Sequence, residues 1–284
     1  MKKSFVLIVI TTLFNFSYTF SQQNKIIRGQ ILDSLENPIK YVNIGILNKP
    51  IGTVSNNKGE FTLNLDNSFI FDTLKISSLG FKSKHILIKE LFDNSNNIFF
   101  LDSYTEELDE VVISSNNLKI YKTGKEKTKS KRQVFFANPE TKNMILGSQI
   151  GRKFSIGKKK FSLLQELKFY IKSNNYEQVK FRVNIYSIKD NVPLKRVNSI
   201  DILTEVARNQ TGWIKVDLTK YDINVKENVI IAIEWIEASK KGNTLSLPIF
   251  VPSFNSTHYY KYSSQAKWRK YKMVSSAMVL TYKQ

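Results

Sequence analysis

The stretch from Ile27 to Phe81 decides the fold of the first third of the chain, because it consists of short apolar segments separated by tight turns. It runs Ile27-Arg28-Gly29-Gln30-Ile31-Leu32-Asp33, then Glu36-Asn37-Pro38, Val42-Asn43-Ile44, Gly52-Thr53-Val54-Ser55, Asn56-Asn57-Lys58-Gly59-Glu60-Phe61 and Leu79-Gly80-Phe81. Alternating apolar residues indicate β-strands, and Gly, Asn and Pro between them are typical of turns. The stretch therefore predicts a small β-sandwich rather than a catalytic site.

The same alternation continues beyond Phe81 and predicts an all-β domain of about seven strands. Gly29 leaves room for a neighbouring backbone or ring to approach the first strand, and Gly59 can take a positive φ in the loop of a hairpin. A single helical turn is expected at 89–92. Strands are expected at 26–32, 41–47, 53–55, 60–65, 73–77, 81–88, 97–101 and 108–114.

These motifs, together with the closing Leu108-Asp109-Glu110-Val111-Val112, resemble the carboxypeptidase regulatory-like domain over residues of about 26–113. The resemblance implies a transthyretin-like, seven-stranded β-sandwich of the kind that accompanies other modules in envelope proteins of Bacteroidetes. It implies no catalytic residues in this part of the chain. We therefore expect residues 22–113 to form an accessory domain that folds, spaces or binds.

Residues 1–21 have the composition of an export signal peptide. Lys2 and Lys3 give a basic start, residues 5–16 are largely apolar, and Thr19 and Ser21 suit a cleavage site before Gln22. No later segment approaches the roughly 20 apolar residues that a membrane-spanning helix needs. We expect an exported protein of the periplasm, the outer-membrane surface or the medium, with no transmembrane segment in the mature chain.

The chain has no cysteine and only two histidines, His85 and His258. The missing cysteines exclude disulfides, thiolate nucleophiles, cysteine zinc sites and a lipid anchor on an N-terminal cysteine. A metallocarboxypeptidase centre or a catalytic triad does not fit so few histidines. We expect no metal, no cofactor and no enzymatic activity.

The net charge of +19 is concentrated in the second part of the chain. Residues 22–113 hold 9 basic and 12 acidic side chains, whereas residues 114–284 hold 32 basic and 12 acidic ones. A cationic surface attracts polyanions such as acidic polysaccharide. However, 36 of the 43 basic residues are lysine, and arginine is the usual choice for specific anion recognition. An anionic surface polymer is thus one possible partner, and a merely solvated surface is the alternative.

Residues 114–133 are expected to be a basic linker, because they hold seven basic residues and one acidic residue. Residues 134–284 are expected to form a second, jelly-roll-like β-sandwich. Its predicted strands cover 161–171, 179–186, 213–218, 229–235, 245–251 and 277–282. In them Trp213 and Trp235 are expected in the core, and Leu163, Leu167, Phe169 and Ile171 on one buried face.

The best candidate site is a group of aromatic and cationic residues near the C-terminus. Flat exposed rings bind the apolar faces of sugars, and neighbouring polar groups fix their orientation. The same mixture suits single-stranded nucleic acid, which an exported protein seldom meets, so no nucleic-acid partner is expected. The alternative is that alternate rings pack into the sandwich. The candidate ligand-binding residues are Tyr259, Tyr260, Tyr262, Trp268, Arg269 and Tyr271.

Three functions remain open at this point. The first is an exported, non-catalytic envelope protein that binds a glycan or a cell-surface partner. The second is a carbohydrate-active jelly-roll enzyme, which needs two carboxylates converging on one cleft; Asp217, Glu234 and Glu237 are the candidates, although Glu234 fits an outward-facing position on its strand. The third is a structural envelope component that pairs with another protein through its sheet edges.

Overall fold

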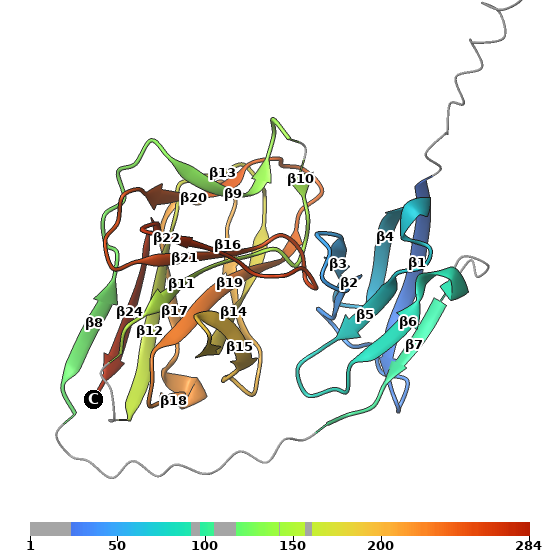
Figure 1. Ribbon diagram of the computed structural model, residues 1–284, viewed down its shortest axis with the longest axis horizontal. Coiled ribbons are helices and arrows are strands. Elements are labelled where there is room, and N and C mark those ends of the chain that lie inside the picture. Colours follow the sequence, from blue (N-terminus) through green and yellow to red (C-terminus); the bar gives the residue numbers. More distant parts are fainter. Residues whose placement is uncertain (1–23, 92–96, 105–117, 142, 157–160) are drawn as a thin grey trace, which may run out of the picture.

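The computed structural model describes residues 24–91, 97–104, 118–141, 143–156 and 161–284, and these form two β-sandwiches that lie side by side (Figure 1). Within the described residues the helical segments are short 3-10 turns only, which confirms the all-β prediction. No helix there is long and apolar enough to cross a bilayer. The expected signal peptide and the expected strand at 108–114 lie outside the described residues.

The described residues of the N-terminal sandwich form seven strands in two sheets, in agreement with the seven-stranded sandwich that the sequence predicts. One sheet has the order β4 (Glu60–Asp66), β1 (Asn24–Asp33), β7 (Asn97–Leu101), and the other has the order β3 (Gly52–Val54), β2 (Asn43–Ile46), β5 (Thr73–Ser77), β6 (Lys84–Leu87). Strand β7 runs parallel to β1, and the remaining pairs are antiparallel. The 3-10 turn η2 (Ile88–Leu91) follows β6, close to the helical turn expected from the sequence, and a further turn, η1 (Asn67–Phe69), follows β4.

Local sequence explains this sandwich. In β4 the residues alternate between exposed and buried, so that Phe61 and its apolar neighbours reach the core. A Cβ atom on Gly29 would lie 2.5 Å from the carbonyl oxygen of Asn97 and 2.8 Å from the ring of Phe61, so only glycine allows this packing. Gly59 takes φ of 72° in the hairpin loop. Both expectations for these glycines are confirmed.

The C-terminal sandwich is antiparallel and jelly-roll-like. Its large sheet has the order β15 (Val192–Arg196), β14 (Val179–Lys189), β19 (Val229–Ala238), β11 (Gln149–Phe154), β21 (Thr257–Lys261), β22 (Arg269–Lys272), with β16 (Ile202–Val206) also paired to β14. The second sheet has the order β17 (Gly212–Asp217), β12 (Ser162–Ile171), β24 (Met278–Lys283), β8 (Ile120–Gly124), with β18 (Asn224–Val225) on β12, and the 3-10 turn η3 (Thr219–Tyr221) follows β17. A third has the order β10 (Asn143–Met144), β9 (Gln133–Asn138), β20 (Leu245–Phe250), β13 (Ser173–Asn174), with β23 (Ser275–Ser276) on β20.

The main core of this sandwich corrects two expectations about which residues are inside. Trp235 is buried, but Trp213 is only half-buried and meets Tyr170 edge to face, because its position alternates with that of the buried Ile214. In β12 a register shift lies between Leu164 and Glu166. Such a bulge reverses the side-chain alternation, so Leu164 is buried where Leu163 was expected.

The expected linker at 114–133 is not free along its whole length, because part of it is a strand of the second domain. Residues 120–124 form β8, which pairs with β24 at the edge of the second sheet. Tyr121 stacks on Tyr282 with ring centroids 5.6 Å apart. Lys122, the basic residue of β8, remains exposed to solvent while the backbone of the strand extends the sheet. A strand at a sheet edge needs only one paired side, so a weak apolar pattern suffices to hold it.

The N-terminal sandwich packs against the outer face of the large sheet, on the right-hand side of Figure 1. The apolar part of this interface joins Tyr41 and Val54 of the first domain to Ile236 of the second. The loop between β21 and β22 reaches the first domain, where the hydroxyl of Ser264 donates to the carbonyl of Ile44 (2.7 Å). The two sandwiches therefore share a buried interface.

A charged network lies at the centre of this interface. Arg182, with a side chain only 1% exposed, donates to the Glu234 carboxylate (2.9 Å), the Tyr41 carbonyl (2.9 Å), the Asp201 carboxylate (3.1 Å) and the Asn43 amide oxygen (3.0 Å). Burial alone would lower the pKa of Arg182, but Glu234 and Asp201 raise it, so the guanidinium stays charged. Glu234 does point away from the main core, yet it is fully buried because the first domain covers that face.

Candidate aromatic pocket

The alternation of β21 divides the candidate aromatic residues between two faces. Tyr259 is completely buried in a small cluster on the outer face of the large sheet, and its hydroxyl donates to the carbonyl of Asn191 (3.0 Å). His258 and Tyr260, one position to either side, face the opposite way and line a pocket. Tyr259 therefore has a packing role and is not available to a ligand.

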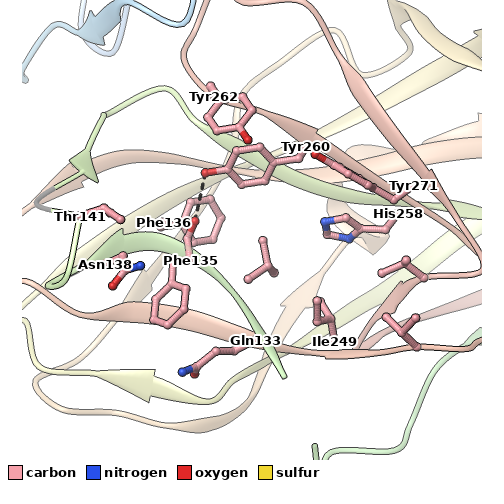
Figure 2. A pocket seen from close by; sticks show the side chains of 13 residues that line it. Gln133, Phe135, Phe136, Asn138, Thr141, Ile249, His258, Tyr260, Tyr262 and Tyr271 are labelled. Atoms are coloured by element: carbon pink, nitrogen blue, oxygen red, sulfur yellow. Dashed lines mark hydrogen bonds between the residues drawn. The ribbon is translucent and has the colours of Figure 1, made fainter. Parts of the chain in front are cut away.

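The pocket has a volume of about 390 Å³ and lies between β9 with the end of β20 on one side and the β21–β22 hairpin on the other (Figure 2). Of the six candidate residues, the structure brings Tyr260, Tyr262 and Tyr271 to this pocket. The remaining labelled residues of the lining are Gln133, Phe135, Phe136, Asn138, Thr141, Ile249 and His258. Among the described residues that line it there is no lysine, arginine, aspartate or glutamate.

The tyrosines of the pocket are held in place by direct contacts. The Tyr260 hydroxyl donates to the carbonyl of Phe135 (3.0 Å), shown as a dashed line in Figure 2, and this bond ties the hairpin to β9. Burial raises the pKa of Tyr260, so this hydroxyl remains protonated. The ring of Tyr262 meets that of Tyr260 edge to face at 4.6 Å. Tyr271, in contrast, is 40% exposed and stands at the rim.

His258 is the most unusual residue of the pocket. Its imidazole extends from β21 into the space between the large sheet and the sheet of β9 and β20 (Figure 2) and is 3% exposed. Burial, followed by the nearby Arg152 cation, lowers the pKa of His258 to about 4, so the ring is neutral near pH 7. Its Nδ1 atom is buried and has no hydrogen-bond partner among the described residues. A buried polar atom without a partner is rare and is costly unless another group satisfies it.

Trp268 and Arg269 lie outside the pocket. Trp268 packs edge to face against Tyr186 (5.6 Å) and Tyr259 (6.5 Å), on the outer face of the sheet. Arg269 is exposed and lies over the ring of Tyr262, with its Cζ atom 4.9 Å from the centroid. The arginine thus supports one wall of the pocket from outside.

Sequence reasoning missed His258 and the whole β9 side of the pocket. The histidine could have been found, because it has the same strand parity as Tyr260 and Tyr262. The contribution of β9 could not, since Phe135 and Asn138 are more than a hundred residues from the hairpin in sequence. Only the pairing of β9 with β20 brings them there.

The three carboxylates considered for catalysis do not converge. Glu234 is buried against Arg182 and accepts from the Asn184 amide (2.8 Å). Glu237 bonds to Lys180 (3.3 Å) and accepts from the Tyr41 hydroxyl (2.8 Å). Asp217 lies on the second sheet, where it accepts from the Thr219 hydroxyl. A pair of carboxylates flanking one cleft, as glycoside hydrolysis requires, is not formed by these residues.

Comparison with known proteins gives similar solved structures and a match to a protein family. No curated protein matches the chain. Among solved structures, it is similar to the cysteine protease and lectin-like domains of Cwp84, a surface-layer-associated protein of Clostridium difficile, with 10% identity over 86% of this chain and 58% of that chain and a TM-score of 0.41. It is also similar to the VP2 subviral particle of infectious bursal disease virus, with 10% identity, coverage of 92% and 62%, and a TM-score of 0.29.

The chain spans about three-fifths of the length of these two structures, and the TM-scores are too low to define a shared fold. The match to a protein family is more direct. The model of the CarboxypepD_reg-like domain matches residues 27–113, which cover the seven strands of the N-terminal sandwich from Ile27 onward. This family model does not extend to the second sandwich. Residues 27–113 are therefore a carboxypeptidase regulatory-like domain.

Proposed function

We propose that this chain is an exported, non-catalytic binding protein whose second sandwich binds a neutral sugar unit in the aromatic pocket. The regulatory-like first domain fits an accessory or binding module. The pocket volume of about 390 Å³ lies within the roughly 300–1,000 Å³ typical of small-molecule sites. An exported location suits a ligand on the cell envelope.

The observation that carries this proposal is the Nδ1 of His258, which has no partner among the described residues, in a pocket whose described lining holds no charged side chain. A neutral imidazole has one donor and one acceptor nitrogen. A sugar hydroxyl can donate or accept, so it satisfies Nδ1 in either tautomer of the imidazole. Tyrosine rings offer flat apolar surfaces to the C–H face of a sugar. A charged ligand, in contrast, would lose its hydration without meeting an opposite charge among the described lining residues.

Calorimetric titration with a panel of neutral oligosaccharides tests the proposal. We expect saturable binding to the full chain that changes little between low and high salt, because no charge pair contributes to it. Absence of saturable binding to every neutral oligosaccharide of the panel would show that the proposal is wrong.

The rim residue Tyr271 provides the variant, and Tyr121 provides a matched control. The two tyrosines are 40% and 42% exposed, and each lies beside another aromatic ring, but only Tyr271 lines the pocket. We expect Tyr271→Ala to weaken binding about tenfold, which equals about 1.4 kcal/mol, and Tyr121→Ala to leave it unchanged. Equal effects of the two substitutions would contradict binding in this pocket.

A further inference from the structure

A second pocket, of about 240 Å³, lies between the two sandwiches and has a different chemical character. The first domain contributes Lys75 and Ser77 of β5, and the second contributes Arg196 of β15 and Lys261 of β21. Within the part of the chain that the structure describes, no aspartate or glutamate lines it. Three cations from two domains thus face one small space.

The carboxylates nearest to this pocket already have partners. Asp201 bonds to both Arg182 (3.1 Å) and Arg196 (3.4 Å), so it neutralises only part of the charge of Arg196. Glu234 bonds to Arg182 and does not line the pocket. Lys180, at the edge of the same interface, is paired separately with Glu205 (3.1 Å) and Glu237 (3.3 Å). An excess of positive charge therefore remains at the pocket.

Lys261 carries much of this excess. Its ammonium makes no ion pair within the described part of the chain and lies over the ring of Trp268, 5.6 Å from the centroid. The pKa of Lys261 is lowered to about 8: burial is the main cause, Glu234 opposes the shift, and the nearby Lys75 and Arg196 add to it. A partly buried cation held beside two others is unfavourable unless an anion compensates it.

Neutral donors complete the pocket. Ser77 accepts a hydrogen bond from the Gln265 amide (2.8 Å), which leaves its hydroxyl hydrogen free to donate to a ligand. Ser78 also lines the pocket. Cations and hydroxyl donors that face one space are the groups that bind carboxylate, sulfate and phosphate oxygens.

We propose that this interdomain pocket binds one small oxyanionic group, such as a carboxylate, a sulfate or a phosphate, with Lys75, Arg196 and Lys261 as its charged contacts. The pocket is smaller than sites for drug-sized ligands, so it accommodates a single charged unit. That unit can be a free small anion or one residue of an acidic polymer. The proposal does not depend on sugar binding in the aromatic pocket, which lies on the other face of β21.

The test is calorimetric titration of the full chain with sodium sulfate, sodium phosphate, sodium glucuronate and the polyuronate alginate, with sodium chloride at equal ionic strength as the reference. We expect saturable binding of at least one small anion. Binding of glucuronate but not of alginate identifies a free small anion as the ligand. Binding of both, with the same dependence on the variants, identifies an acidic polymer. Absence of binding beyond the chloride reference would overturn the proposal.

Variants on both sides of the interface make the result specific. We expect Lys261→Met and Lys75→Gln each to weaken binding about tenfold or more, whereas Lys261→Arg retains it. The control is Lys270→Gln, which removes one positive charge from an exposed position on β22 outside the pocket. An equal loss in the control would show attraction by net charge and overturn the proposal. Lys75 lies in the other domain, so its variant provides an independent result if Lys261→Met fails to fold.

Discussion

Replacement of Arg182 by methionine tests how the two domains are joined. In the wild type the guanidinium donates to two carboxylates, a backbone carbonyl and an amide oxygen, and two of these four acceptors belong to the first domain. Arg182→Met keeps the side-chain volume roughly constant but leaves Glu234 charged, fully buried and without its cation. Loss of one partner from a buried ion pair costs about 3–5 kcal/mol. We therefore expect Arg182→Met to lower the free energy of unfolding by about 3–5 kcal/mol, which corresponds to a decrease in Tm of about 10 °C for a chain of this size.

Urea denaturation followed by tryptophan fluorescence measures this effect, since Trp235 lies in the core next to Glu234 in sequence. The exposed Arg208 is the matched control, and Arg208→Met should change the free energy of unfolding by no more than about 0.5 kcal/mol. The double variant Arg182→Met/Glu234→Met should recover much of the loss, because the unpaired charge is gone. Two results would contradict a stabilising role of the buried Arg182–Glu234 pair. One is a decrease in the free energy of unfolding below about 1 kcal/mol in Arg182→Met. The other is a double variant no more stable than Arg182→Met.

Three further predictions concern His258, Gly29 and Lys261. The pKa of His258 is about 4 in the folded chain and 6.5 in the unfolded chain, so the unfolded chain binds more protons between these values. The free energy of unfolding should therefore fall by about 3 kcal/mol as pH drops through this range. In urea titrations at several pH values, His258→Gln should reduce this fall, and an unchanged fall in the variant would show that another group causes it. Gly29→Ala should cost about 1–3 kcal/mol in thermal denaturation, because the added methyl meets the Asn97 carbonyl; a wild-type Tm would show that the contact is easily relieved. The pKa of Lys261 is lowered from 10.5 to about 8, so the free energy of unfolding should rise as pH increases between these values. The same urea titrations should show no such rise in Lys261→Met, and a rise that persists in the variant would show that another group causes it.

The first domain could be predicted almost entirely from its sequence. Its strands alternate regularly, and the role of Gly59 follows from its neighbours within the hairpin loop. Information of this kind is local. The neighbours of Gly29 are more distant, since Asn97 is 68 residues away, but a glycine within a strand already indicates a close approach. The departures are small: the strand expected at 81–88 is shortened to β6 (Lys84–Leu87).

The second domain could be predicted in class but less well in detail. The bulge at Leu164 and Glu166 changes which side chains face the core, and no residue type marks it. Strand β11 was not predicted, although it lies between β19 and β21 in the large sheet. Its sequence, Gln149-Ile150-Gly151-Arg152-Lys153-Phe154, is too polar to suggest a central strand.

The interface between the domains could not be predicted at all. Arg182 and Tyr41 are 141 residues apart in sequence, and nothing in the sequence around either residue marks the other as its partner. The candidate pocket shows the same limit. Strand parity could have assigned Tyr260 and Tyr262 to one face and Tyr259 to the other, but only tertiary packing sets Phe135 opposite them and moves Trp268 away.

The binding of a neutral sugar beside His258 is the central claim, and nuclear magnetic resonance of ¹⁵N-labelled histidine side chains tests it most directly. The chain has two histidines, and the exposed His85 on β6 serves as an internal reference. The account predicts that a neutral saccharide shifts the imidazole signals of His258 in a saturable manner while those of His85 stay constant. If a neutral saccharide binds saturably in calorimetry but leaves the imidazole signals of His258 unchanged, binding beside His258 is contradicted.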